Sequence, residues 1–296
     1  MTGIAATNAG APRVQDVIAR HEAAGRRFTA DGVGSFVRRA GTGEPVVLMH
    51  GLPASSYLYR KVIEELAAMG FDAMSFDLPG LGLADRPPEV DVSVAGLGRF
   101  SAAAVDALGL TSFHLVVHDA GGPVGFEMCR LLGERVRSLT ILNTMLGLGS
   151  APYPGEVLAR VTHAVRGPMA SPRMWRLMMR RVGIADMSAL SAAELDAYRV
   201  LALGDDRGAG YLRIMRGLRS APPGGYRAVV DSRRVPYPVA IGWGARDPIL
   251  PLKRNGLAVL AATGLTSLSA VPGKHYLQED QAPAVAGIIA ANAGRA

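Results

Sequence analysis

The feature that most constrains this chain is a regular alternation of short apolar runs with segments of helical spacing, which begins at residue 45. The runs are continuous, as in strands buried on both faces, whereas the segments between them repeat their apolar residues every three or four positions. Strands that alternate with helices form a parallel sheet covered by helices on both faces. The predicted strands are 45–49, 71–76, 113–117, 138–142, 238–243 and 267–271, and the predicted helices are 57–69, 94–108, 122–132, 253–262 and 282–291.

Two segments flank or interrupt this pattern. Residues 28–39 predict a pair of strands around the Asp31-Gly32 turn. From 146 to 235 the alternation stops, and helical segments rich in Arg and Met lie between Pro and Gly breaks. We therefore predict one α/β core, 28–145 with 236–296, a helical cap inserted at 146–235, and an N-terminal tail and helix at 1–27. A length of 296 residues is compatible with a single core that carries one insertion.

The net charge of +7 is concentrated in the predicted cap, where fourteen arginines face seven acidic residues. Arginines on helices with a polar outer face are usually solvated, and no nucleic-acid motif accompanies them. No run reaches the roughly 18 apolar residues that a membrane span needs, and the opening residues lack a secretory pattern. We expect a soluble cytoplasmic protein that binds a small molecule, as a monomer or homodimer, and neither nucleic acid nor membrane.

Cys129 is the one cysteine of the chain. It cannot form an internal disulfide, and no Cys or His lies near it at metal-ligand spacing. We interpret it as a small buried apolar residue, and we expect neither a metal nor a cofactor.

Three titratable residues follow three predicted strands. Asp119 follows strand 113–117, Asp247 follows strand 238–243, and His275 follows the last strand. Active residues of an open parallel sheet gather beyond the carboxyl ends of its strands. Taken singly, each residue has a plain alternative as a helix cap, a turn residue or a structural histidine. Their joint order of nucleophile, acid and base favours a catalytic triad.

The turn after strand 113–117 resembles a nucleophile elbow. It reads His-Asp-Ala-Gly-Gly at 118–122, and its small residues permit the strained strand-to-helix turn that exposes a nucleophile, with Asp119 where serine is common. Several other short sequence motifs resemble those of the haloalkane dehalogenase and epoxide hydrolase branch of the α/β-hydrolases. They lie at 50–53, 56–60, 77–82, 244–247 and 275–280, and the motifs at 56–60 and 275–280 are more similar to those of the dehalogenases.

That resemblance covers the chain from about residue 28 to its end, apart from the cap, and it implies an eight-stranded, mostly parallel sheet. It also implies that Asp119 attacks an electrophilic carbon to form an alkyl ester. His275 then activates water, and Asp247 holds the tautomer of His275 and stabilises its charged form. The backbone N–H groups of Leu52 and Ala120 are expected to form the oxyanion hole.

The chain departs from the dehalogenase pattern at two side chains. Dehalogenases usually carry Trp after the nucleophile and Asn or Glu after His-Gly, and these positions here hold Ala120 and Leu52, which cannot donate a hydrogen bond. Trp175 in the cap is a candidate replacement donor, although packing is its commoner role. Epoxide opening instead needs cap tyrosines that polarise the ring oxygen, for which Tyr211 is the first candidate and Tyr153 the second.

The sequence leaves several functions open. The leading hypothesis is a haloalkane dehalogenase-like hydrolase that acts on small apolar electrophiles. An epoxide hydrolase is the alternative. A ligand-binding homologue without catalysis is a further possibility, since fold does not dictate function, but the intact triad argues against it. A carboxylesterase is disfavoured because an Asp nucleophile would form a labile anhydride with an acyl group. Asn143, which follows strand 138–142, is interpreted as a hydrogen-bonding residue at a strand end rather than as a catalyst.

Overall fold

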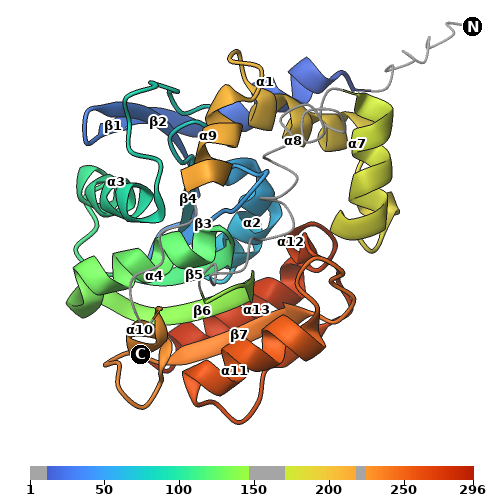
Figure 1. Ribbon diagram of the computed structural model, residues 1–296. Coiled ribbons are helices and arrows are strands. Elements are labelled where there is room, and N and C mark those ends of the chain that lie inside the picture. The colour runs from blue at the N-terminus through green and yellow to red at the C-terminus, as the bar shows by residue number, and fades with distance from the viewer. Residues whose placement is uncertain (1–11, 147–170, 218–224) are drawn as a thin grey trace, which may run out of the picture.

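The computed structural model describes residues 12–146, 171–217 and 225–296, and these form a central sheet with helices on both faces (Figure 1). The described strands are β1 (Gly25–Ala30), β2 (Val33–Ala40), β3 (Pro45–Met49), β4 (Asp72–Phe76), β5 (Phe113–Asp119), β6 (Val136–Thr144), β7 (Val239–Gly244) and β8 (Ser269–Val271). Within the described residues the eight strands follow the order β1-β2-β4-β3-β5-β6-β7-β8. Strand β2 is antiparallel to both neighbours, and every pair from β4 to β8 is parallel. The predicted α/β fold is confirmed.

The helices cover both faces of this sheet. They are α1 (Val14–Ala23), α2 (Arg60–Ala68), α3 (Val94–Ala107), α4 (Gly121–Leu132), α7 (Pro172–Met178), α8 (Ala192–Leu203), α9 (Ala209–Gly217), α10 (Arg227–Val230), α11 (Leu257–Thr263), α12 (Leu277–Asp280) and α13 (Ala282–Ala293). Helices α2 and α13 pack together on one face, and α3 and α4 pack together on the other. Among the described residues, none of these helices has the length and apolarity to cross a membrane.

The central strands are buried as their continuous apolar runs predict. Every residue of β4 and β5 is buried, and in β3 the residues after Pro45 are fully shielded from solvent. Helix α2 buries one stripe, formed by Arg60, Val62, Ile63 and Leu66, at the spacing of a helix packed on a sheet. The core therefore lies between the sheet and the helices of each face.

Several element boundaries differ from the sequence prediction, and three of them have a structural cause. The segment expected as one helix at 57–69 begins with a 3₁₀ turn, Ser56–Tyr59, before α2. The segment expected at 253–262 similarly begins with a π-helical turn, Leu252–Gly256, before α11. Strand β5 continues two residues beyond the prediction, through Asp119, because Asp119 still pairs with Thr144 of β6 after a register shift. Long-range pairing thus extends a strand where local pattern ends it.

A helical region is inserted between β6 and β7, and its described part comprises 171–217 and 225–235. Helix α8 begins at a capping box, in which Ser191 and Glu194 satisfy each other's backbone N–H groups. The region contacts the core through its backbone, since the N–H of Tyr276 donates to the carbonyl of Gly183 at 2.8 Å. Residues 147–170 and 218–224 of the predicted cap lie outside the described residues.

A buried cluster of charges also joins this region to the core. The guanidinium of Arg60 on α2 pairs with both carboxylate oxygens of Glu279 on α12, which also accepts a hydrogen bond from the hydroxyl of Tyr198 on α8. Arg60 reaches Glu194 on α8 as well, at 3.2 Å, and Lys61 lies 3.2 Å from Glu279. The side chain of Glu279 is fully shielded from solvent, so its charge depends on these partners.

Candidate active site

The site is built around a strained turn at the end of β5. Asp119 has a positive φ of 51°, which few residues other than glycine adopt. A Cβ atom at Gly121 would overlap the His50 carbonyl, and one at Gly122 would overlap the Thr144 side chain. The turn therefore requires glycine at both positions, and the small residues after Asp119 have a steric origin.

Asp119, His275 and Asp247 come together at the carboxyl ends of β5, β8 and β7. The His275 Nε2 atom lies 3.3 Å from Asp119 Oδ2, and its Nδ1 atom lies 2.8 Å from Asp247 Oδ2. All three residues are buried, with His275 only 1 % exposed. One imidazole thus lies between two carboxylates, which is the arrangement that the sequence predicts for nucleophile, base and supporting acid.

Asp247 is held in place by several donors. Its Oδ1 accepts from the backbone N–H groups of Ile249 and Leu250 at 2.8 and 3.0 Å, and its Oδ2 accepts from the Asn143 amide at 2.6 Å. Burial alone would raise the pKa of Asp247, but attraction to His275 and these hydrogen bonds lower it below its ordinary value. Asp247 is therefore a fixed anion.

Asn143, at the end of β6, bridges two parts of the site. Its Nδ2 donates to the same Asp247 oxygen that His275 contacts, and its Oδ1 accepts from the Gly244 N–H at 2.8 Å. The sequence analysis predicts a hydrogen-bonding role for Asn143 at a strand end, and the structure contains these hydrogen bonds. The partner could not be identified from sequence, because Asp247 is 104 residues away.

We expect Asn143→Ala to lower kcat about ten-fold with little change in KM, because one donor that holds the Asp247 carboxylate is removed. Steady-state kinetics on a substrate that the wild type turns over would measure this split. Asn292→Ala is the matched control, since Asn292 is also buried but donates to Leu139 and Thr140 within the sheet. Equal kcat in Asn143→Ala and wild type would contradict a positioning role.

The two neighbouring carboxylates shift the pKa of His275. Burial disfavours its charged form, but Asp247 and Asp119 more than offset burial and raise the pKa of the imidazole to about 10. The pKa of Asp119 is lowered, because contact with His275 outweighs the effect of burial. The resting site therefore pairs an imidazolium with two carboxylates.

This pairing predicts a pH dependence of stability. A group with a raised folded pKa contributes stability that is fully present below its unfolded pKa, about 6.5, and that is lost as the pH rises through its folded pKa. The wild-type Tm should therefore fall between about pH 7 and pH 10, and it should fall less in His275→Gln. Thermal melts at constant ionic strength would test this, with His114→Gln as the control substitution. Parallel pH profiles for wild type and His275→Gln would contradict it.

The backbone donors that the sequence predicts for an oxyanion hole lie beside Asp119. The backbone N–H of Leu52 donates to Asp119 Oδ1 at 2.8 Å. A Cβ atom at Gly51 would overlap Asp119 and would lie 2.7 Å from the Ala120 nitrogen, so this nitrogen faces the same small space. The glycine before Leu52 is thus required for the close approach of the two backbones. Both donors are main chain, which is why the apolar side chains at 52 and 120 do not remove them.

A second histidine, His118, supports His275, and the sequence prediction missed it. His118 donates from Nε2 to the backbone carbonyl of His275 at 2.9 Å, and the two rings lie 4.9 Å apart. Burial, followed by the charge of His275, lowers the pKa of His118 to about 4. His118 is therefore neutral near pH 7 and fixes the loop of His275 without competing for its proton. Its place beside Asp119 at the end of a buried strand was the available signal.

The cap residues predicted to contact the substrate or leaving group lie in different places. Trp175 is fully buried, and its indole N–H donates to the Leu195 carbonyl at 2.6 Å within the cap. Its one donor is used there, so Trp175 has no free donor for a leaving group. Tyr211 on α9 is buried, and burial and then the charge of Asp119 raise the pKa of its hydroxyl. Tyr153 lies outside the described residues.

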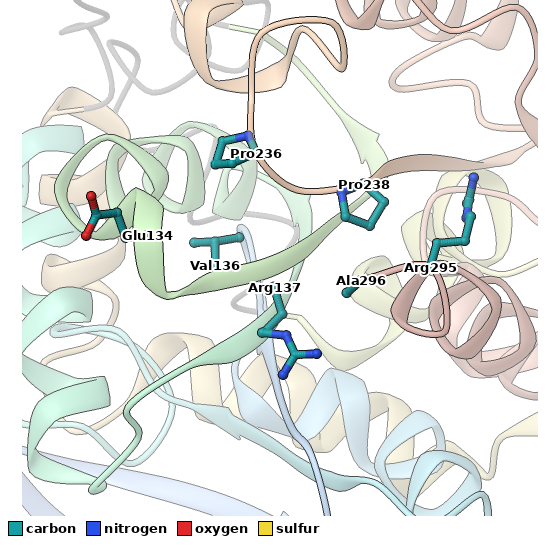
Figure 2. Close-up of a pocket in the computed structure, with 7 residues that line it drawn as sticks. All are labelled: Glu134, Val136, Arg137, Pro236, Pro238, Arg295 and Ala296. Atoms are coloured by element: carbon teal, nitrogen blue, oxygen red, sulfur yellow. The ribbon is translucent and has the colours of Figure 1, made fainter.

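A cavity of about 410 Å³ lies elsewhere, at the amino ends of β6 and β7 (Figure 2). Val136, Arg137 and Pro238 line it together with the C-terminal residues. Asp119, Asp247 and His275 lie at the opposite, carboxyl edge of the parallel strands, so this cavity does not belong to the site. No group of three or more metal-ligating side chains occurs in the three described stretches.

Comparisons with known proteins agree with this geometry. Residues 44–199 match the family model described as the alpha/beta hydrolase fold. Haloalkane dehalogenase 2 of Mycobacterium bovis is 27 % identical over 266 residues, covering 84 % of this chain and 87 % of that protein. The crystal structure of an epoxide hydrolase from Vigna radiata superposes with a TM-score of 0.72 at 19 % identity, covering 92 % of this chain and 98 % of that one. A meta-cleavage product hydrolase from Pseudomonas fluorescens superposes with a TM-score of 0.75 at 19 % identity, over 92 % and 98 % of the two chains. With its matched core and its strand order, this chain belongs to the α/β-hydrolase fold family.

Proposed function

We propose that the protein is a hydrolase that works through a covalent alkyl ester on Asp119, as in haloalkane dehalogenases, and that acts on small apolar electrophiles. The observation that carries the proposal is a carboxylate, rather than a hydroxyl, at the strained turn after β5, with His275 3.3 Å away. A carboxylate can displace a leaving group from carbon directly. The similarity to haloalkane dehalogenase 2 supports the same chemistry.

The first half-reaction needs no base. One oxygen of Asp119 attacks the substrate carbon, a C–O bond forms, and the leaving group departs with the electron pair of the bond that breaks. The Leu52 N–H, 2.8 Å from Asp119 Oδ1, orients the carboxylate. The reacting carbon, the nucleophile and water supply every atom and electron, so we propose that no cofactor is required.

The second half-reaction needs His275 as a base. Esterification removes the negative charge of Asp119, which is one of the causes of the raised pKa of His275, so the imidazole then releases its proton more readily. Neutral His275 takes a proton from water, and the hydroxide adds to the ester carbonyl. The backbone N–H groups of Leu52 and Ala120 stabilise the resulting oxyanion. Collapse of this intermediate restores Asp119 and releases an alcohol.

One observation favours epoxide hydrolysis as the second candidate function. Neither Leu52 nor Ala120 offers a side-chain donor to a departing halide, and the Trp175 donor is already bound to Leu195. The Tyr211 hydroxyl, by contrast, lies where the charge of Asp119 acts on it. A phenol in that position can donate to the oxygen of an opening epoxide ring, and the product is then a diol.

A panel of haloalkanes, epoxides and esters would distinguish these functions. Each compound is incubated with the enzyme, and release of halide, diol or acid is measured. We expect halide or diol, and Tyr211→Phe should reduce diol formation selectively if the epoxide function holds. Acid release from esters alone, or no product from any compound, would overturn the proposed chemistry.

A further inference from the structure

A second cavity, of about 180 Å³, lies where α1, the core and the cap helix α8 meet. None of the proposed catalytic residues lines it. Its wall combines side chains from α1, β2, the 3₁₀ turn before α2, α2 itself and α8. The polar side chains that line it are Arg20, His21, Arg38, Tyr57, Arg60 and Glu194.

The excess positive charge of this cavity comes from Arg20 and Arg38, because Arg60 is already paired with Glu194 and with the buried Glu279. Three guanidinium groups line it against one carboxylate, and that carboxylate, Glu194, already pairs with Arg60 at 3.2 Å. Arg38 pairs at 2.8 Å with Glu64, whose side chain is two-thirds exposed to solvent. Burial lowers the pKa of Arg38 despite that partner, which means that the buried charge is incompletely compensated. Arg20 has no ion-pair partner among the described residues.

Two buried polar atoms on the residues lining this cavity also lack partners. The Tyr57 hydroxyl and the His21 Nδ1 atom have no hydrogen bond within the described part of the chain, although Tyr57 is 1 % and His21 2 % exposed. A buried polar atom without a hydrogen-bond partner destabilises the folded state relative to one that has a partner. Burial and the charges of Arg38 and Arg60 lower the pKa of His21 to about 3, so His21 is neutral and adds no positive charge.

We propose that this cavity is a binding site for a small oxyanion with the chemistry of hydrogen phosphate, recognised by Arg20, Arg38 and the Tyr57 hydroxyl. Guanidinium groups match oxyanions in both charge and geometry, and a phenol donates to them. Hydrogen phosphate also carries one hydroxyl, which can serve the His21 Nδ1 atom if that atom is an acceptor. The other ring nitrogen of His21 lies 3.2 Å from the Ser56 hydroxyl.

The position of this site gives the oxyanion a structural consequence. Glu194 contributes the cap side of the wall, and it shares Arg60 with the buried Glu279. An anion bound by Arg20, Arg38 and Tyr57 would join α1 to the core in one contact. Binding to the folded state alone raises stability with ligand concentration, so occupancy should be visible as an increase in Tm.

The test uses the full-length protein and inorganic phosphate at constant ionic strength, with isothermal titration calorimetry and thermal melts. We expect saturable binding at one site and a phosphate-dependent rise in Tm. Tyr57→Phe should weaken binding about 3- to 10-fold, as expected for one hydrogen bond. Because the Tyr57 hydroxyl has no partner, the Tm of unliganded Tyr57→Phe should equal or exceed that of the wild type. Arg20→Gln, at an exposed position, should weaken binding about three-fold.

Matched controls separate this cavity from general attraction to a basic protein. Tyr226→Phe removes another buried hydroxyl that lacks a partner among the described residues, and Arg26→Gln removes another exposed arginine. Neither residue lines the cavity, so both variants should bind phosphate as the wild type does. The absence of saturable binding would overturn the proposal. Equal weakening in the control variants, or unchanged affinity in both Tyr57→Phe and Arg20→Gln, would overturn it as well.

Discussion

Asp119→Ala should abolish turnover, by a factor of about 10⁴ or more, while the protein remains folded. The substitution removes both carboxylate oxygens that the proposed covalent ester requires. Because Asp tolerates the positive φ of this position better than Ala does, the variant should lose some stability in addition to the Asp119–His275 contact. Activity assays, together with thermal melts, would separate loss of chemistry from loss of fold.

A buried aspartate outside the site provides the matched control. Asp231 is 2 % exposed and pairs with Arg233 at 2.8 Å. Asp231→Ala should therefore retain turnover even if it lowers the Tm. If Asp119→Ala keeps more than a few per cent of wild-type activity, Asp119 is not the nucleophile.

His275→Ala should trap the reaction halfway. Asp119 can still attack a true substrate without a base, whereas the ester is no longer hydrolysed efficiently, so the alkyl-enzyme accumulates. Intact-protein mass spectrometry should show one added substrate fragment per chain. Peptide mapping should then place the fragment on the segment that contains Asp119.

The double variant Asp119→Ala with His275→Ala is the control, and it should show no added mass. An adduct on any other residue would exclude Asp119 as the nucleophile. If no adduct forms with a substrate that the wild type turns over, His275 is needed before or during the first displacement. The two variants thus test the two half-reactions separately, and a halide or epoxide substrate serves equally well.

Local pattern was sufficient for the sheet and for the edge of the sheet at which the proposed site residues meet. Continuous apolar runs predict buried strands because both faces of a parallel sheet are covered, and β3 to β7 follow these runs closely. The carboxyl ends of parallel strands share one edge, so residues that follow different strands, such as Asp119 and His275, were expected to meet. They do meet, at 3.3 Å.

Only the tertiary structure decided how the remaining groups are paired. Asn143 with Asp247, Trp175 with the Leu195 carbonyl, and Arg60 with Glu279 are contacts between residues 20 to 219 positions apart. A hydrogen bond forms within about 3 Å, and its partner depends on how helices and loops pack. The sequence by itself determined the periodicities, and hence the fold and the edge where chemistry gathers. Packing decided which buried polar groups have hydrogen-bond partners. Among the described residues, the Tyr57 hydroxyl has none. This outcome depends on distances that no local pattern encodes.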